Sequence, residues 1–130
     1  MLTLIIRTDK PEAEIGLYSG VEKVAYKKWM AHRALAETIH QKIKALLEST
    51  HNNLHALEGI IVFKGPGSFT GLRIGMSVAN ALAYSLSIPI VSAEGKDWIE
   101  VGLNDINAGK NEVTAMPEYG AVPHITQQRK

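Results

Sequence analysis

The hydrophobic and polar positions at the start of the chain follow the two-residue period of β-strands. Residues 2–8 are mostly apolar and β-branched, residues 13–18 alternate in character, and residues 21–29 show a third strand-like pattern. Turn-forming sequences at residues 9–11 and 19–20 separate the three segments. The pattern predicts two successive hairpins, and therefore an antiparallel meander.

From residue 31 onward the pattern changes to alternating helices and buried strands. Residues 31–49 carry an apolar stripe at helical spacing, with charged side chains elsewhere, which predicts an amphipathic helix. Residues 60–63 are apolar without interruption, as is typical of a strand buried on both faces. We expect a helix over 71–86, a strand over 88–93 and a short helix over 95–106. The order strand–strand–strand–helix–strand–helix–strand–helix predicts an α/β domain.

The helix expected over 71–86 is rich in small residues and has no charged residue after Arg73. A helix that is apolar on all sides is buried on more than one side. Gly75, Ala79 and Ala83 are spaced four apart and form one strip along the helix axis. We expect this strip to face a partner helix. The large side chains beside the strip are Leu72, Met76 and Leu86, and those expected to face the sheet are Ile74, Val78 and Leu82.

Length and composition fit one domain of ordinary apolar content, with 130 residues and a net charge of +1. This charge does not indicate a nucleic-acid surface. The absence of cysteine excludes disulfides, thiolate metal sites and cysteine nucleophiles. The apolar patch at the start is too short for a signal peptide or a membrane span, so we expect a cytoplasmic protein without a membrane partner. We predict a domain over residues 1–106 and a flexible C-terminal tail over residues 107–130, because the tail lacks a sustained apolar period.

A glycine-rich turn joins the strand over 60–63 to the following helix. Its spacing differs from that of a P-loop, which needs Gly-Lys followed by Ser or Thr, and from the Gly-x-Ser-x-Gly of hydrolases. We therefore predict a structural role, in which the turn permits close packing of the helix. The residues with this role are Gly65, Pro66, Gly67, Ser68, Thr70, Gly71 and Arg73. A helix start after glycines, with Arg73 nearby, could also hold an anion, and the sequence leaves this open.

Histidine spacing raises the question of a metal site. His51 and His55 are four residues apart, but they lie in an expected turn, and a zinc site would need a third converging ligand. We predict no metal site, no cofactor and no catalytic residue.

The run GPGSFTGLRIG at residues 65–75, followed by Ala79, residues 81–83, residues 88–89 and Val91, resembles the signature of the TsaB (YeaZ) family. Members of this family are non-catalytic partners in the bacterial machinery that makes threonylcarbamoyladenosine beside the tRNA anticodon. The resemblance implies a single actin-like, ribonuclease-H-like half-domain with a mixed five-stranded sheet and packed helices.

The resemblance also implies partners. These are a TsaD-type catalytic subunit, through it a TsaE-type ATPase, and a second copy of the chain when it is alone. Both kinds of pairing would use the helices over 31–49 and 71–86. The partner-binding residues that we predict are His32, Leu35, Ile39, Ile43, Leu72, Gly75, Met76, Ala79, Ala83 and Leu86.

Two features separate this chain from the family pattern, and two further possibilities stay open. Family members typically carry Asp-Thr-Ser where residues 7–10 read Arg-Thr-Asp-Lys, which weakens a nucleotide or metal role. Members continue into a second lobe, so the resemblance implies a shortened form lacking most of that lobe. The alternative function is a small nucleotide-binding enzyme of the actin-like fold, although nucleotides in that superfamily lie between two lobes. The basic end, residues 127–130, is a candidate for tRNA contact.

Overall fold

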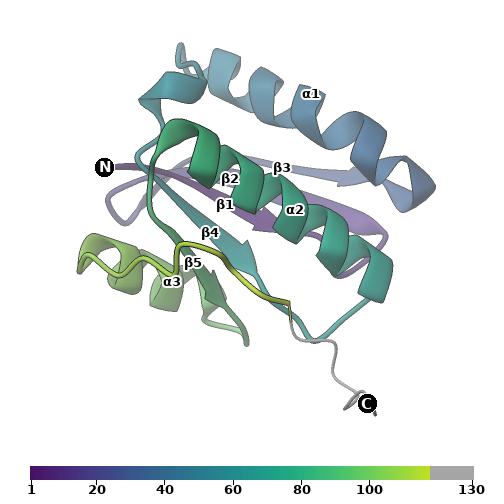
Figure 1. The fold of residues 1–130 in the computed structure, drawn as a ribbon. Helices are drawn as coiled ribbons and strands as arrows, with labels where there is room; N and C mark the ends of the chain where they lie inside the picture. The colour runs from purple at the N-terminus through teal and green to yellow at the C-terminus, as the bar shows by residue number, and fades with distance from the viewer. Residues whose placement is uncertain (118–130) are drawn as a thin grey trace, which may run out of the picture.

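The centre of the structure is a five-stranded mixed sheet, in a computed structural model that describes residues 1–117 (Figure 1). The strand order is β3-β2-β1-β4-β5; β1 pairs antiparallel with β2 and parallel with β4, while β2–β3 is antiparallel and β4–β5 parallel. The predicted element order and mixed sheet are confirmed. The elements are β1 (Leu2–Arg7), β2 (Glu12–Ser19), β3 (Glu22–Met30), a 3₁₀ turn η1 (His32–Ala34), α1 (Leu35–Ser49), a 3₁₀ turn η2 (Leu54–Ala56), β4 (Gly59–Phe63), α2 (Phe69–Leu86), β5 (Ile90–Ala93) and α3 (Trp98–Asn107).

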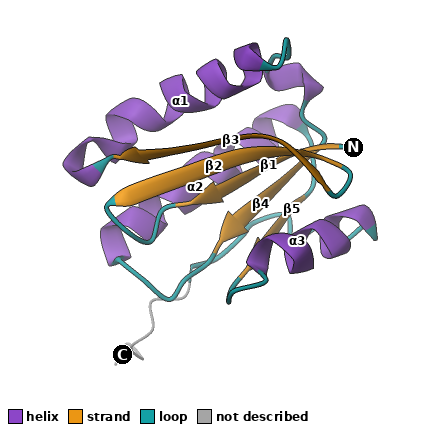
Figure 2. Cartoon of the chain, turned by 180° about the vertical axis from the view of Figure 1, so that it is seen from behind, coloured by secondary structure: helices purple, strands orange, loops and turns teal. Residues whose placement is uncertain are grey.

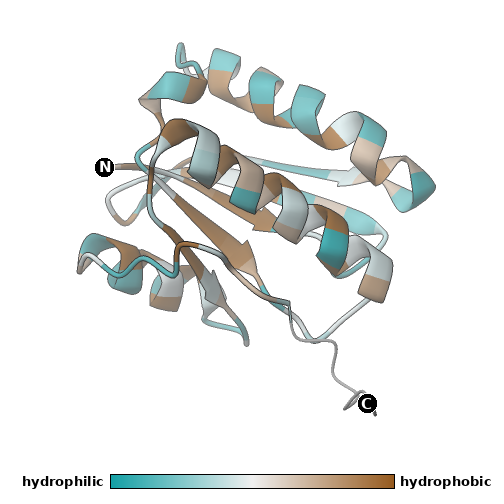
Figure 3. Ribbon diagram, in the orientation of Figure 1, coloured by the Kyte–Doolittle hydropathy of each residue, from teal (hydrophilic) through white to brown (hydrophobic). Residues whose placement is uncertain are grey.

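The helices cover the two faces of the sheet unequally. α1 and α2 lie side by side on one face, and α3 lies on the other face (Figures 1 and 2). Successive residues of β1 supply both cores, because side chains alternate along a strand. Leu4 and Ile6 pack in the cluster that includes residues of α1 and α2, whereas Ile5 packs with Trp98 and Leu103 of α3. Figure 3 shows the central strands as hydrophobic and much of the outer side of α1 as hydrophilic.

The first two turns of α2 lie directly against the end of β1. The hydroxyl of Thr8, which is 1% exposed, donates a hydrogen bond to the carbonyl of Gly71 at 2.7 Å. A Cβ atom at Gly75 would lie 2.1 Å from Thr8 Oγ1, and one at Gly71 would lie 2.2 Å from the Thr8 carbonyl oxygen. Both distances are too short for a real Cβ, so only glycine permits this approach.

The predicted outward strip of α2 faces inward in the structure, which corrects the expected phase of this helix. Gly75, Ala79 and Ala83 are buried beneath the helix, where their small size lets α2 approach the sheet rather than a partner helix. The residues expected to face the sheet instead line a groove between α1 and α2; they are Ile74, Val78 and Leu82.

The burial of α1 and α2 also corrects the predicted set of partner-binding residues. Eight of the ten residues are buried and offer a partner little surface; they are Leu35, Ile39, Ile43, Leu72, Gly75, Met76, Ala79 and Ala83. Two of them, Leu35 and Ile43, nevertheless line hollows between the two helices. Of the remaining two, His32 is exposed and Leu86 is partly buried. The prediction that these two helices carry a partner surface therefore rests on their other residues.

The segment after α3 packs against the body, contrary to the expectation of a loose tail from residue 107. The Glu112 amide donates to the carbonyl of Ile90 at 2.8 Å, and the Glu112 carboxylate accepts from the amide and the hydroxyl of Ser92. The side-chain amide of Asn80 exchanges two hydrogen bonds with the backbone of Ala115, at 2.8 and 3.0 Å. Because these contacts are polar, they produce no periodic pattern of apolar residues from which the packing of this segment could have been predicted. Residues 118–130, with the predicted RNA-contacting end, lie outside the described residues.

Substituting Gly75 by alanine tests the close approach of α2 to β1. Helix propensity alone would favour Gly75→Ala by about 1 kcal/mol. The added Cβ would collide with the Thr8 hydroxyl, and overpacking of this kind costs about 1–3 kcal/mol. We expect a net loss of unfolding free energy in chemical denaturation, partly relieved in the double variant with Thr8→Ala. The exposed Ser77→Ala is the control and should change little. A stabilised Gly75→Ala protein would show that the helix does not lie this close.

Asn80→Ala tests the docking of residues 111–115. The change leaves the backbone N–H and C=O of the buried Ala115 without their partners, which costs about 1–3 kcal/mol. We expect faster hydrogen exchange at the Ala115 amide, while amides of the central β4 keep their protection. Asn104→Ala, on the exposed side of α3, is the matched control. An Ala115 amide that exchanges equally fast in wild type and Asn80→Ala would contradict the docking.

Candidate functional site

A groove runs along the outer surface between α1 and α2. It consists of three adjoining hollows of about 430, 370 and 440 Å³, from the N-terminal to the C-terminal ends of the two helices. Thr70 and Ile74 belong to the first and second hollows, and His40 to the second and third, so the hollows join. We call this feature the α1–α2 groove, and its parts the N-terminal, middle and C-terminal hollows.

The N-terminal hollow lies beside the glycine-rich turn. Ser68 is the N-cap of α2, and its hydroxyl accepts from the Gly71 amide at 3.4 Å. The turn is fastened to the β1–β2 connection because the Ser68 amide donates to the carbonyl of Asp9 at 3.1 Å. The polar and charged residues that line this hollow are Lys10, His32, Arg33, Ser68 and Thr70.

The middle hollow is flanked by the outward face of α2. Arg73, Ser77 and Ala81 are exposed and spaced four apart, so they stack along one side of the helix. Arg73 places its guanidinium 5.3 Å from the centre of the Phe69 ring. The side chains of Ser77 and Ala81 are small, which leaves a low strip beside the groove.

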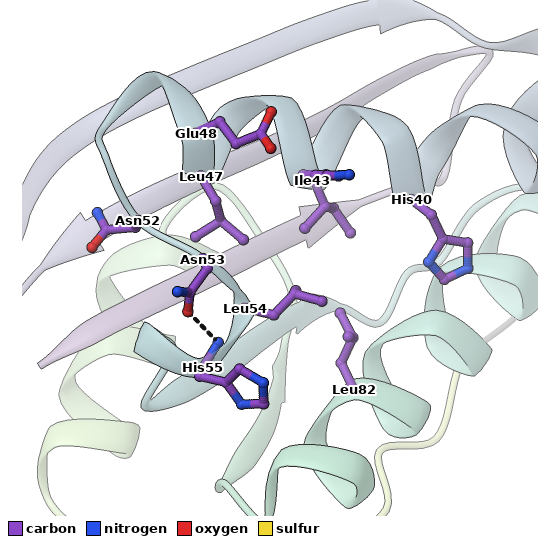
Figure 4. A pocket seen from close by; sticks show the side chains of 10 residues that line it. His40, Ile43, Leu47, Glu48, Asn52, Asn53, Leu54, His55 and Leu82 are labelled. Carbon is purple, nitrogen blue, oxygen red and sulfur yellow. Dashed lines mark hydrogen bonds between the residues drawn. The ribbon is translucent and has the colours of Figure 1, made fainter.

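The C-terminal hollow has an apolar floor and a polar rim. Figure 4 shows Leu54 of η2 and Leu82 of α2 pointing toward one another below Ile43 and Leu47 of α1. Leu54 is 38% exposed although it is a large apolar side chain. The rim contains His40, Lys44, Glu48, Asn52, Asn53 and His55. The Asn53 side chain caps η2 by accepting from the His55 amide at 2.9 Å.

Positive charge predominates along the groove. Its three hollows are lined by the cations Lys10, Arg33, Lys44 and Arg73 and by a single carboxylate, that of Glu48. The ion pairs found in residues 1–117 join Arg7 to Asp9, Lys64 to Glu94 and Lys110 to Asp105, and none involves a lining residue of the groove. The groove therefore presents cationic groups that the described part of the chain does not neutralise.

Asp9, displaced from the acidic position of the family's Asp-Thr-Ser turn, is held by Arg7. The Asp9 carboxylate accepts from Nε and Nη2 of Arg7 at 2.8 and 3.2 Å, and its side chain is 7% exposed. This hydrogen bonding raises the pKa of Arg7 above its usual value, although partial burial opposes the shift. The Arg7 guanidinium also stacks 4.0 Å over the Phe63 ring. Both oxygens of Asp9 are thus engaged within the protein.

Two features of the described residues bear on metal and membrane roles. Within residues 1–117, no three His, Asp or Glu side chains are grouped so that they could hold a metal ion. None of the helices described combines the length and the hydrophobicity that crossing a membrane requires.

Exposed groove residues that the sequence did not point to include Ala36, His40 and Lys44 of α1 and Ser77 of α2. Ser77 was missed because α2 was given the wrong rotational phase, and the α1 residues were missed because no single stretch of sequence shows that the two helices enclose a groove. Arg73 is the signal in the sequence that could have fixed the rotational phase of α2. The single charged residue of the helix must face water, and Ser77 and Ala81 follow Arg73 at four-residue spacing. His32, which was predicted, does line the groove.

Comparison with known proteins places the chain in a family. The model described as "TsaD: tRNA N6-adenosine threonylcarbamoyltransferase" matches residues 29–94, about half of the chain. A protein of Geotalea daltonii with the name tRNA N6-adenosine threonylcarbamoyltransferase is 44% identical over 62 residues, covering 48% of this chain and 18% of its own. The tRNA threonylcarbamoyladenosine biosynthesis protein TsaB of Bacillus subtilis is 62% identical over 34 residues, covering 26% of this chain and 15% of its own.

The solved structure of YeaZ from Pseudomonas aeruginosa superimposes with a TM-score of 0.66 at 25% identity, covering 72% of this chain and 43% of the other. The chain spans 43% of that solved structure and, by the matches to the Geotalea daltonii and Bacillus subtilis proteins, less than a fifth of the length of each curated relative. The mixed sheet, with two helices on one face and one on the other, is the actin-like, ribonuclease-H-like half-domain expected from the sequence. Motif, fold and comparisons agree: the chain belongs to the family that the TsaD model describes, and within it to the TsaB (YeaZ) proteins.

Proposed function

We propose that this protein is a non-catalytic scaffold subunit that pairs with a TsaD-type catalytic protein in the threonylcarbamoyladenosine modification of tRNA. The family membership supports the pathway. The observation that carries the pairing is the exposed face of α2, which has one charged residue in an 18-residue helix and borders the α1–α2 groove.

This face has the shape that helix packing requires. Ridges of side chains on one helix fit grooves on another, and small residues at the contact allow the axes to approach. Ser77 and Ala81 supply the low strip, and the adjoining groove can receive the larger side chains of a partner helix. Tyr84, which is 87% exposed at the far end of this face, is the kind of aromatic side chain that is enriched in protein interfaces.

The pairing also defines the wider assembly that we propose. A TsaE-type ATPase would join through the TsaD-type subunit, and a second copy of the chain would occupy the same face when that subunit is absent.

The scaffold role agrees with the engagement of Asp9 by Arg7, because a carboxylate already held by a guanidinium is a poor ligand for a nucleotide-bound metal ion.

One observation favours the second candidate function, a small nucleotide-binding protein of the actin-like fold. The N-terminal hollow places Lys10 and Arg33 beside the start of α2, a helix terminus that attracts phosphates. The position of Lys10 and Arg33 differs from that expected in a nucleotide cleft between two lobes. Both residues lie on the α1–α2 side of the sheet, and the hollow that they line opens into the rest of the groove. We therefore favour the scaffold role.

Ala81→Arg tests the proposed pairing. Ala81 is exposed, so arginine should leave the monomer folded, yet it would place bulk and charge in the middle of the contact face. We expect association with the TsaD-type protein of the same organism to weaken by about 100-fold or more, which corresponds to about 3 kcal/mol. Sedimentation velocity of the two proteins, mixed and separate, measures this. Asn104→Arg on α3 is the matched control and should bind as wild type does.

Two results would count against the proposal: wild type that does not associate, and Ala81→Arg that associates as strongly as wild type. Ala79→Arg is not a suitable probe. Ala79 is 0% exposed, so an arginine there should unfold the monomer rather than block a contact.

Titration with a fluorescent ATP analogue and Mg²⁺ separates the two candidate functions. We expect no saturable binding below about 1 mM, a range that would include the usual affinities of nucleotide-dependent enzymes. Saturable binding that Lys10→Ala abolishes, and that the exposed control Lys96→Ala leaves intact, would favour the nucleotide-binding function instead.

A further inference from the structure

We infer that the α1–α2 groove selects an acidic amphipathic helix of its partner, with carboxylates toward the N-terminal ends of α1 and α2 and a large apolar side chain in the C-terminal hollow. This inference rests on the proposed function, and it adds the chemistry and the orientation of the partner surface. Two independent features of the groove carry it, namely the distribution of charge and the position of the apolar floor.

The charge of the groove changes along its length. Lys10 and Arg33 line the N-terminal hollow and Arg73 the middle hollow, and neither of these two hollows has a carboxylate in its lining. Glu48 lies at the other end, where it shares the C-terminal hollow with Lys44. Both helices begin at the cationic end, and the positive ends of their dipoles add to the same potential. Carboxylates of a partner are therefore best placed at this end.

The apolar floor lies at the opposite end of the groove. Leu54 and Leu82 converge there from η2 and α2, below the buried Ile43 and Leu47 in the view of Figure 4. The hollow of about 440 Å³ has room for a large side chain such as leucine, phenylalanine or tryptophan. Apolar anchors that enter such hollows supply much of the energy of an interface, and charged rims supply specificity and association rate. His40 and Lys44 stand on this rim and can pair with a carboxylate beside the anchor.

The same charges oppose pairing with a second copy of the chain. A two-fold axis would bring the same surface of each copy together, so one cationic groove would face another. Like charges across an interface cost affinity and act against the wrong partner. The groove should thus prefer a chain of opposite charge to itself, and a self-associated form should be the weaker of the two.

Charge reversal in the groove, measured against the TsaD-type protein of the same organism, tests the inference. The variants are Arg33→Glu/Arg73→Glu, Lys44→Glu and Leu54→Ala, and the matched control is Lys96→Glu on the exposed turn before α3. We expect the double charge reversal to weaken binding by about tenfold or more, chiefly through slower association. Leu54→Ala should act chiefly through faster dissociation, and the control should match wild type. Surface plasmon resonance reads both rates.

Ionic strength gives a second readout that needs no variant. Binding of wild type should weaken steadily between about 50 and 500 mM salt, because exposed charges are screened over this range. The double reversal should flatten this dependence. Tight binding of all variants with no salt dependence would overturn the inference while leaving the proposed pairing intact. Absence of wild-type binding would overturn both, and self-association stronger than binding to the TsaD-type protein would overturn the predicted preference.

Discussion

The close approach of α2 to the end of β1 is the constraint on which the rest of the structure depends. Thr8, buried between them, donates to the Gly71 carbonyl, and no side chain would fit at Gly71 or Gly75. Because the first turns of α2 are fixed on β1, its small residues face the sheet and its opposite side, from Arg73 to Tyr84, is turned to solvent. The groove beside α1 is a consequence of this phase.

Both edges of the sheet are protected against pairing with another strand, which leaves the helical face as the surface suited to association. Residues 111–112 cover the β5 edge, where Asn111 and Glu112 take up hydrogen bonds that a further strand would otherwise make. The β3 edge carries exposed lysines, which discourage edge-to-edge pairing; they are Lys23, Lys27 and Lys28. The exposed face of α2, beside the cationic α1–α2 groove, has no comparable protection against association with another protein.

Periodicity in the sequence was enough to predict the five strands and three helices, because each buries a regular set of apolar positions. It failed for the phase of α2, since a helix that is apolar nearly all round does not show which side is buried, and small residues suit a sheet as well as a partner helix. It failed again for residues 111–115, which are held through Asn80, Ser92 and backbone groups. The positions of His40, Lys44 and Arg73 around one groove depend on the packing of two helices, which no single stretch of sequence specifies.

The central claim is that the chain binds its partner through the outer side of α1 and α2. Hydroxyl-radical footprinting of the chain, free and with the TsaD-type protein, tests it most directly, because the large side chains on different faces are exposed at the start. Tyr84 and Leu54 border the proposed contact, whereas Val101 on α3 and Met30 on β3 lie outside it. We predict that oxidation of Tyr84 and Leu54 falls in the complex while Val101 and Met30 are oxidised as before. Protection of Val101 or Met30, with Tyr84 and Leu54 unchanged, would contradict the account.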